Sequence, residues 1–222
     1  MQSALPPPNE AARLQALRDL DVLDSGPEEE FDALIKVASL VCGVPISLIS
    51  LVDTERQWFK ANIGLPGVTE TPRDVAFCAH AILDDGLFEV PDASQDARFF
   101  DNPLVVSQPD IRFYAGEPIT LSDGSRIGTL CVIDRQPRQL NSMQRDVLHM
   151  LALAAAQALE GRRAIRARHA IEEELQQEQL ALNEAQERVR LANESGGIGI
   201  WDINLETGVL LWDAQKLPTL WT

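Results

Sequence analysis

Cysteine and histidine are scarce in this sequence. Among 222 residues there are three histidines and three cysteines, Cys42, Cys78 and Cys131, with no Cys-x-x-Cys pair. An odd number of dispersed cysteines is atypical of a disulfide framework and predicts a reducing compartment, the cytoplasm. No Ser/His/Asp set, phosphate-binding loop or paired metal-binding carboxylates stand out, and so few histidines leave little for acid–base catalysis. We therefore expect a chain that is not an enzyme, with no catalytic residues, no metal ion and no cofactor that can be named.

Basic residues and long apolar runs are also few. Lysine and arginine number 19 against 34 acidic residues, which gives a formal net charge of -15. That charge repels a phosphate backbone, and the short basic run at residues 162–168 is too narrow to offset it, so we expect no nucleic-acid partner. No stretch approaches the roughly 20 apolar residues that a membrane span needs, and residues 1–9 are polar and proline-rich. We therefore predict neither a membrane span nor a secretion signal.

Residues 9–160 have the pattern of one α+β domain. Apolar residues at helical spacing predict helices over residues 9–20, 27–43 and 74–83, the last capped by Asp74. Alternating apolar residues predict strands over residues 45–53, 57–63, 87–90, 111–121 and 126–134, with a polar loop over residues 92–109. Tight turns join the strands into hairpins, so we expect an antiparallel sheet with the helices from both ends of the sequence packed on one face.

One long helix is predicted after this domain. No proline occurs between Pro137 and Pro218, and residues 142–194 form one helical pattern, which would be roughly 80 Å long. Apolar residues recur in it at heptad spacing, namely Ile171, Leu175, Leu182, Ala185 and Val189. Such a stripe predicts a coiled coil in a parallel homodimer.

The upstream part of this helix has a second apolar seam. It contains Leu148, Leu151, Ala155, Ala158 and Ile165, and its phase slips by one residue before Ile171. A phase slip strains or unwinds a supercoil locally, and we interpret it as a place where twist can change. Two alternatives stay open for the upstream half: it pairs with a partner helix, or it packs on its own sheet.

Five blocks of sequence carry a resemblance to a known family. They are SLVDTERQWFKANIGL (50–65), ETPRDVAFCAHAIL (70–83), VPDASQDARFFDNPLV (90–105), IRFYAGEPI (111–119) and GTLCVIDRQPR (128–138). In this order they resemble a bacterial GAF domain of the kind found at the head of sensor histidine kinases and diguanylate cyclases. The resemblance covers about residues 5–160. From residue 188 onward, RVRLANESGGIGIWDINLETGVLLW is similar to the opening of a PAS domain, with a first hairpin around Thr207.

These resemblances imply four segments: a flexible one at residues 1–8, a GAF domain at 9–160, a coiled-coil signalling helix at 161–190 and the incomplete start of a PAS domain at 191–222. A GAF ligand sits between the sheet and the helix and loops that cover it. By that resemblance the candidate ligand-binding residues are Trp58, Lys60, Phe77, Cys78, His80, Asp92, Arg112, Tyr114 and Cys131. The structural alternative is that Asp92, Asp96 and Arg98 fasten a loop and that Cys131 is a buried apolar side chain.

Cys78 and His80 are the most reactive pair among these candidates. Positions two apart on a helix point about 200° away from each other, so the two side chains are not expected to share a metal ion. The family also includes methionine sulfoxide reductases with a cysteine nucleophile and bilin photoreceptors with an attachment cysteine, but residues 105–112 hold no cysteine. Covalent chromophore attachment is therefore not expected.

The resemblance implies a sensory input module. A small ligand or another cue acts on the GAF domain, and the dimeric helix relays the response to a PAS domain and an output domain outside this chain, a histidine kinase or a diguanylate cyclase. Two alternatives remain: a redox-active or sulfoxide-reducing GAF enzyme that uses Cys78, and a GAF domain without a ligand that serves only as a dimerisation scaffold.

Overall fold

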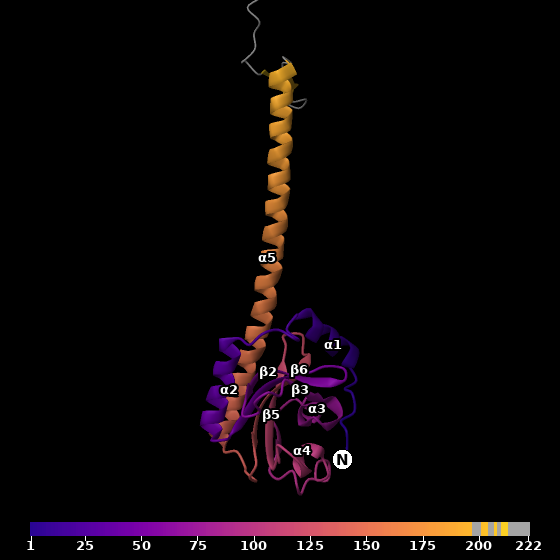
Figure 1. Cartoon of the computed structure of the whole chain (residues 1–222), viewed down its shortest axis with the longest axis vertical. Helices are drawn as coiled ribbons and strands as arrows, with labels where there is room; N and C mark the ends of the chain where they lie inside the picture. The colour runs from indigo at the N-terminus through magenta and orange to yellow at the C-terminus, as the bar shows by residue number, and fades with distance from the viewer. Residues whose placement is uncertain (197–200, 204–206, 208–209, 213–222) are drawn as a thin grey trace, which may run out of the picture. The chain divides into compact units, whose positions relative to one another are not determined.

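The computed structural model describes residues 1–196, 201–203, 207 and 210–212 (Figure 1). The chain divides into two compact units, Met1–Ile165 and Arg166–Thr222. The first unit contains a mixed α+β fold, as predicted. The candidate site lies in this unit.

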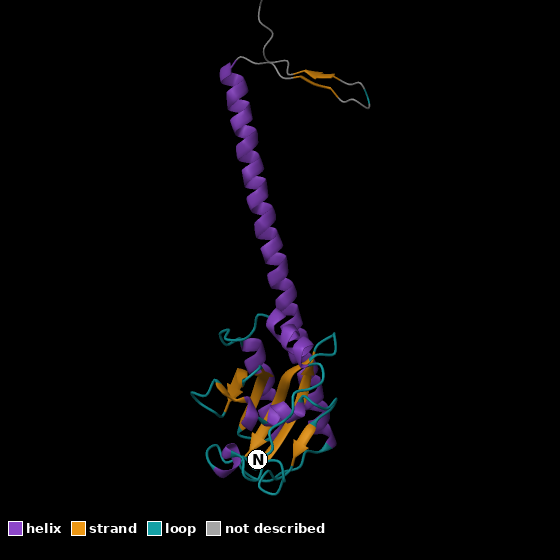
Figure 2. Cartoon of the chain, turned by 90° about the vertical axis from the view of Figure 1, so that its right-hand side faces the viewer, coloured by secondary structure: helices purple, strands orange, loops and turns teal. Residues whose placement is uncertain are grey.

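A six-stranded antiparallel sheet forms the centre of the first unit (orange in Figure 2). Its order is β3-β2-β1-β6-β5-β4, and the strands are β1 (Ile46–Val52), β2 (Arg56–Ile63), β3 (Glu70–Pro72), β4 (Phe88–Val90), β5 (Phe113–Thr120) and β6 (Arg126–Asp134). Both predicted hairpins are confirmed, since β1 pairs with β2 and β5 pairs with β6. Strand β3 was not predicted, because three residues are too few to show an alternating pattern.

Helices from both ends of the sequence cover one face of this sheet. They are α1 (Glu10–Asp19), α2 (Glu29–Cys42) and the first part of α5 (Ser142–Gly196). Phe31 and Ile35 of α2 and Leu148 and Leu159 of α5 are fully buried in the core that these helices share with the sheet. The upstream half of the long helix therefore packs on its own sheet, which settles the alternative left open by its apolar seam.

Shorter elements cover the opposite face. They are the 3-10 turn η1 (Arg73–Val75), α3 (Phe77–Ala81) and α4 (Pro103–Val106). The helix predicted from Asp74 to Leu83 is wrong at its start, because Ala76 is extended (φ -79°, ψ 125°) and separates η1 from α3. Helix α4 lies in the predicted loop, where the Asn102 side chain accepts a hydrogen bond from the Leu104 N–H at 2.9 Å.

Helix α5 is continuous from Ser142 to Gly196, as the absence of proline predicts. In the second unit the apolar residues of its expected seam are exposed: Ile171 by 58%, Leu175 by 59%, Leu182 by 52% and Val189 by 56%. Ala185 of the same seam is half-buried. The described residues contain no helix apolar enough to cross a membrane.

Two short strands follow the helix. Strand β7 (Trp201–Ile203) pairs antiparallel with β8 (Leu210–Trp212). Glu206 and Gly208 of the predicted turn lie outside the described residues. The expected PAS-like opening is represented in the described part by this strand pair and Thr207 alone.

Candidate functional site

A cavity of about 140 Å³ lies on the sheet face that α3 and α4 cover. Strands β1, β2, β3, β5 and β6 supply its floor, and α3 with the loops at 64–69 and 107–112 supplies its cover. Its lining consists of Leu48, Gln57, Phe59, Leu65, Val68, Thr71, Phe77, Cys78, Leu104, Gln108, Pro109, Ile111, Tyr114 and Ile133. None of these side chains is acidic, basic or a histidine. The cavity is therefore a mostly apolar space with few polar groups.

The alternation of β2 decides which of its side chains reach the cavity. Gln57 and Phe59 line the cavity, whereas Trp58 packs in the core under α2 and α5. Because successive residues of a strand point to opposite faces, Lys60 lies with Trp58 and away from the cavity. The sequence predicted this division of the strand, yet placed Trp58 and Lys60 among the ligand-binding candidates. The structure separates those two from the cavity residues.

Two polar atoms in the cavity wall have no hydrogen-bond partner in the described part of the chain. They are Gln57 Oε1 and Thr71 Oγ1, and the two residues lie opposite each other on β2 and β3. Buried polar groups are normally hydrogen-bonded, so such a pair calls for an explanation. Neither residue was among the predicted site residues. The available signal was a glutamine on the same strand face as Phe59, where an apolar residue is expected.

Cys78 lies at the inner wall of the cavity and is held by a cluster of hydroxyl groups. Its Sγ accepts hydrogen bonds from Ser50 Oγ at 3.0 Å, Thr129 Oγ1 at 3.0 Å and Tyr114 OH at 3.2 Å. Burial alone would raise the pKa of this thiol, but hydrogen bonds from Cys131, Ser50, Thr129 and Tyr114 outweigh it and lower the pKa to about 7. Thiolate character is therefore favoured at Cys78.

The sheet strands position the donors of this cluster. Ser50 of β1 lies opposite Thr129 of β6, so their hydroxyls meet on one face, 3.2 Å apart. A Cβ at Gly116 would lie 2.2 Å from the Tyr114 hydroxyl oxygen, so only glycine lets this hydroxyl lie where it reaches Cys78. Cys131 is fully buried beside Cys78, and the interaction with that thiol together with burial raises the pKa of Cys131.

The other predicted ligand-binding residues do not line the cavity. His80 Nε2 lies 3.0 Å from Gln2 O in the segment expected to be flexible, and burial lowers the pKa of this imidazole. Asp92 accepts hydrogen bonds from the Ser94 N–H and hydroxyl, and Arg112 donates to the Val105 carbonyl. These contacts fasten loops, and for Asp92 this agrees with the structural alternative.

The same loop shows the expected ion pair. Asp96 accepts from the Arg98 guanidinium, which lies over the Phe88 ring at 4.8 Å. Cys78 and His80 diverge as their helical spacing predicts, because one contacts the hydroxyl cluster and the other the N-terminal segment. Within the residues that the structure describes, no group of three or more metal-ligating side chains comes together.

Trp58 and Lys60 instead border an open groove of about 700 Å³, which shares Phe59, Leu65 and Val68 with the lining of the cavity. The Lys60 ammonium is fully buried and donates to Ser25 Oγ at 2.9 Å, Gly26 O at 2.7 Å and Glu28 Oε1 at 2.6 Å. Glu28 also pairs with Arg162 of α5 at 2.8 Å. Lys60 is therefore satisfied by the protein itself, and its contacts connect β2 to α5.

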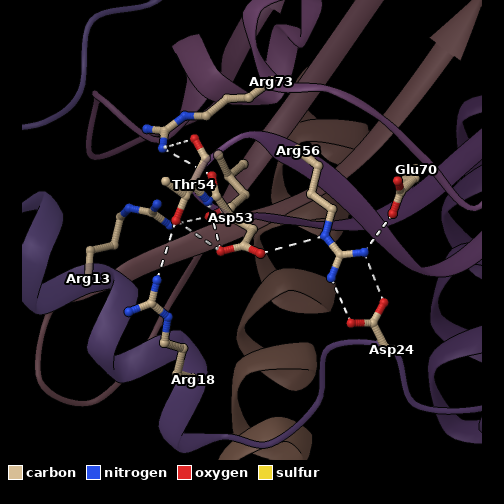
Figure 3. A network of polar contacts seen from close by, with 9 residues as sticks. Arg13, Arg18, Asp24, Asp53, Thr54, Arg56, Glu70 and Arg73 are labelled. Atoms are coloured by element: carbon tan, nitrogen blue, oxygen red, sulfur yellow. Dashed lines mark hydrogen bonds and ion pairs between the residues drawn. The ribbon is translucent and has the colours of Figure 1, made fainter.

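A second polar network holds the turn between β1 and β2 (Figure 3). Arg56 pairs with Asp24 at 2.7 Å, with Glu70 at 2.6 Å and with Asp53 at 3.6 Å. Beside it, Arg13 of α1 and Arg73 of η1 donate to the carbonyls of Val52 and Asp53 (Figure 3). The arginines of this network all have protein partners, so the network stabilises the turn.

Comparison with known proteins identifies the family and the fold of the chain. A sequence model of the GAF domain family matches residues 26–159. A cyclic di-GMP phosphodiesterase of Pseudomonas aeruginosa is 48% identical over 132 residues, which are 60% of this chain and 22% of the relative. The chain thus corresponds to about a fifth of that longer protein.

Solved structures share the fold at low sequence identity. The GAF domain of an Acinetobacter phosphoenolpyruvate-protein phosphotransferase is 18% identical with a TM-score of 0.51, covering 70% of this chain and 98% of that one. The PixJ GAF domain of Thermosynechococcus elongatus, in its blue-light absorbing form, is 16% identical with a TM-score of 0.52, covering 71% and 94%. At these identities the likeness concerns the fold alone.

Proposed function

The chain belongs to the GAF domain family, and from this premise we propose that it is the sensory input region of a bacterial signalling protein. A small molecule occupies the cavity of the first unit, and α5 carries the response to a PAS domain and an output domain elsewhere in the protein. The proposal rests on one observation: the two halves of α5 differ in burial. One side of its first part, from Leu148 to Leu159, is buried in the GAF core, whereas Ile171, Leu175, Leu182 and Val189 farther along are exposed.

A chain of contacts supports a route from the cavity to α5. Gln57 and Phe59 of β2 line the cavity, and Lys60 of the same strand bonds Glu28 on the other face. Glu28 holds Arg162 of α5 as well. A ligand that moves β2 by contact with Gln57 or Phe59 would therefore act on α5 through Lys60 and Glu28. The ligand can shift the equilibrium between two arrangements of β2 and α5 only by as much as its affinities for the two arrangements differ.

Dimerisation is the second part of the proposal. Exposed leucine, isoleucine and valine at heptad spacing are stabilised when a second copy of the helix covers them. A parallel homodimer in the cytoplasm places two identical helices side by side, so that a change of twist in both reaches the output domains together. The Pseudomonas aeruginosa relative favours an output enzyme of cyclic di-GMP metabolism, alongside the histidine kinases that the sequence suggested.

Sedimentation equilibrium on the whole chain tests this proposal. Replacement of Leu182 by Asp puts a charge into the expected seam and should convert the dimer to a monomer. Leu180 is exposed by 57% and lies off the seam, so Leu180→Asp is the matched control and should leave the dimer intact. A wild-type monomer at high concentration, or equal effects of both substitutions, would contradict the proposed relay.

A second candidate function uses the Cys78 thiol. Three hydroxyl donors and a pKa lowered to about 7 favour a reactive thiolate, which is the group that a redox or sulfoxide-reducing GAF enzyme needs. The test is thiol-dependent turnover of peroxide or methionine sulfoxide by the wild type and by Cys78→Ser. Turnover that is lost on substitution would favour the enzyme over the sensor.

A further inference from the structure

One residue of the cavity wall carries a hydrogen-bond acceptor that has no partner among the described residues. Gln57 is 5% exposed and lines the cavity, and its buried Oε1 has no hydrogen-bond partner among the described residues. Thr71 Oγ1 is unpartnered beside it, on the residue paired with Gln57 across β2 and β3. A buried acceptor that has lost water and gained no donor destabilises the folded state, unless a bound molecule supplies the donor.

Other buried polar atoms near this face do have partners. Ser50, Thr129 and Tyr114 direct their hydroxyls to Cys78. Two further buried carboxylate oxygens without a hydrogen bond, on Glu89 and Asp134, form ion pairs with Arg145 and Arg138. Within the described part of the chain, the residue with the unmet acceptor is therefore one that lines the cavity.

The volume and lining of the cavity restrict what can fill it. A cavity of about 150 Å³ holds one benzene molecule, so about 140 Å³ accommodates a single ring or an aliphatic group of similar size. The walls are mainly leucine, isoleucine, valine and aromatic side chains, and no charged side chain lines them. A phosphate or carboxylate would be buried here without a counter-ion, which is strongly unfavourable.

We propose that the ligand is a small, uncharged, largely apolar molecule of about one ring, with one hydroxyl or N–H group that donates to Gln57 Oε1. This ligand class rests on the proposed sensory function and narrows it. Thr71 Oγ1 lies close enough in the pairing of β2 and β3 to share the same polar end of the molecule. Phe59, Phe77 and Leu104 contact its apolar part. Cyclic di-GMP is excluded from this cavity by its size and its phosphates.

Three probes test the proposal on the whole chain: phenol, toluene and cyclic di-GMP, each titrated by ligand-detected NMR. Phenol and toluene have nearly the same shape and differ in the hydrogen-bond donor. Phenol should bind about tenfold more tightly than toluene, because one buried hydrogen bond is formed. Cyclic di-GMP should not compete with phenol.

Three substitutions locate the effect. Gln57→Leu removes the acceptor at similar volume and should abolish or reverse the about tenfold preference for phenol, because the phenol hydroxyl would then be buried without a partner. Gln108 also lines the cavity but is exposed, so Gln108→Leu is the matched control and should keep the preference. Leu104→Phe adds volume inside the cavity and should abolish binding of both probes. Circular dichroism of each variant shows whether the fold is retained.

The outcomes separate the ligand class from the sensory function. If Gln57→Leu and Gln108→Leu keep the same preference, or if toluene binds the wild type as tightly as phenol, the donor requirement is wrong while occupancy of the cavity stands. If cyclic di-GMP displaces phenol, the restriction to uncharged ligands is wrong. If no probe binds the wild type, the ligand class is overturned, and the sedimentation test on α5 decides the relay separately.

Discussion

One face of the six-stranded sheet is closed by α1, α2 and α5, whereas the other is covered by short helices and loops. On the helix-covered face the buried polar groups have partners: Lys60 has three acceptors, and Glu117 contacts His149 of α5 at 2.8 Å. On the opposite face Gln57 Oε1 and Thr71 Oγ1 have no hydrogen-bond partner among the described residues, and both residues line a cavity. The first face is therefore filled and bonded by the protein itself, whereas the second has a cavity.

The largest expected effect concerns packing on the helix-covered face. Phe31 is fully buried between α2 and the sheet, so Phe31→Ala should lower the free energy of unfolding by about 3–5 kcal/mol. Val37 of the same helix is 43% exposed, and Val37→Ala should cost less than about 1 kcal/mol. Urea denaturation measures both. A small loss for Phe31→Ala would mean that this face is less completely packed than the structure indicates.

Glu10 connects Arg13 of α1 to Arg73 of η1 beside the turn between β1 and β2, and it predicts a pH dependence. Burial raises the pKa of this carboxyl, but hydrogen bonds from Arg13 and Arg73 and their charges outweigh burial and lower the pKa from 4.5 to about 2. Because the folded-state pKa is depressed, the stabilisation is complete above the unfolded pKa of 4.5 and is lost as the pH falls toward 2.

Glu10→Gln should therefore cost about 2 kcal/mol at pH 7, a value reduced for the solvent screening of this partly exposed carboxylate. The difference between wild type and variant should shrink between pH 4.5 and 2. Urea midpoints measured across this range provide the check. A difference that does not change with pH would show that the carboxylate charge is not what links α1 to η1.

The next effect concerns the buried cation on the helix-covered face. Glu28→Gln removes the anion shared by Lys60 and Arg162, so we expect a loss of about 1–2 kcal/mol, less than for a fully buried pair because Ser25 and Gly26 still accept from Lys60. The exposed Glu29 beside it gives the control, with a loss of at most about 0.5 kcal/mol for Glu29→Gln. Urea denaturation measures the free energy of unfolding of both variants. If both lose the same amount, the ion pairs of Glu28 with Lys60 and Arg162 do not stabilise the fold.

The smallest effect contrasts two threonines on the cavity side. Thr71 Oγ1 has no partner in the described part of the chain, so Thr71→Val should change stability by less than about 1 kcal/mol, in the stabilising direction. Thr129 Oγ1 donates to Cys78, so Thr129→Val should destabilise by about 1–2 kcal/mol. Thermal unfolding of the two variants compares them. If Thr71→Val destabilises as much as Thr129→Val, the Thr71 hydroxyl already has a partner.

Much of the fold could be predicted from periodicity. The two hairpins, α2 and the long α5 were found because each repeats its pattern over several turns or strand pairs. Strand β3 and helix α4 were missed, since three or four residues do not establish a period. The start of α3 was misplaced because Asp74 resembles a helix cap, whereas the extended Ala76 ends that turn.

The candidate site was predicted less well. Phe77, Cys78 and Tyr114 do line the cavity, Cys131 lies behind Cys78, and the remaining five candidates lie elsewhere. Gln57 could not be recognised as unpartnered, because its possible partners come from β3 and from loops far along the chain. Trp58 and Lys60 were chosen as ligand-binding candidates by residue type. The pleat of β2 directs both side chains to the face of the sheet opposite the cavity.

The order of residues was sufficient to specify the α+β pattern, the hairpins, the continuous helix and the exposed apolar seam at Ile171, Leu175, Leu182 and Val189, because these features depend on neighbours within a few turns or one hairpin. Contacts between distant strands and helices determined three other features. These are the packing of the first half of α5 on its own sheet, the four groups around Cys78, and the acceptor of Gln57 that has no partner among the described residues. The hydrogen-bond partners of a side chain and the volume of a cavity depend on contacts between residues far apart in sequence. Local sequence patterns therefore do not predict them, and only the tertiary structure shows them.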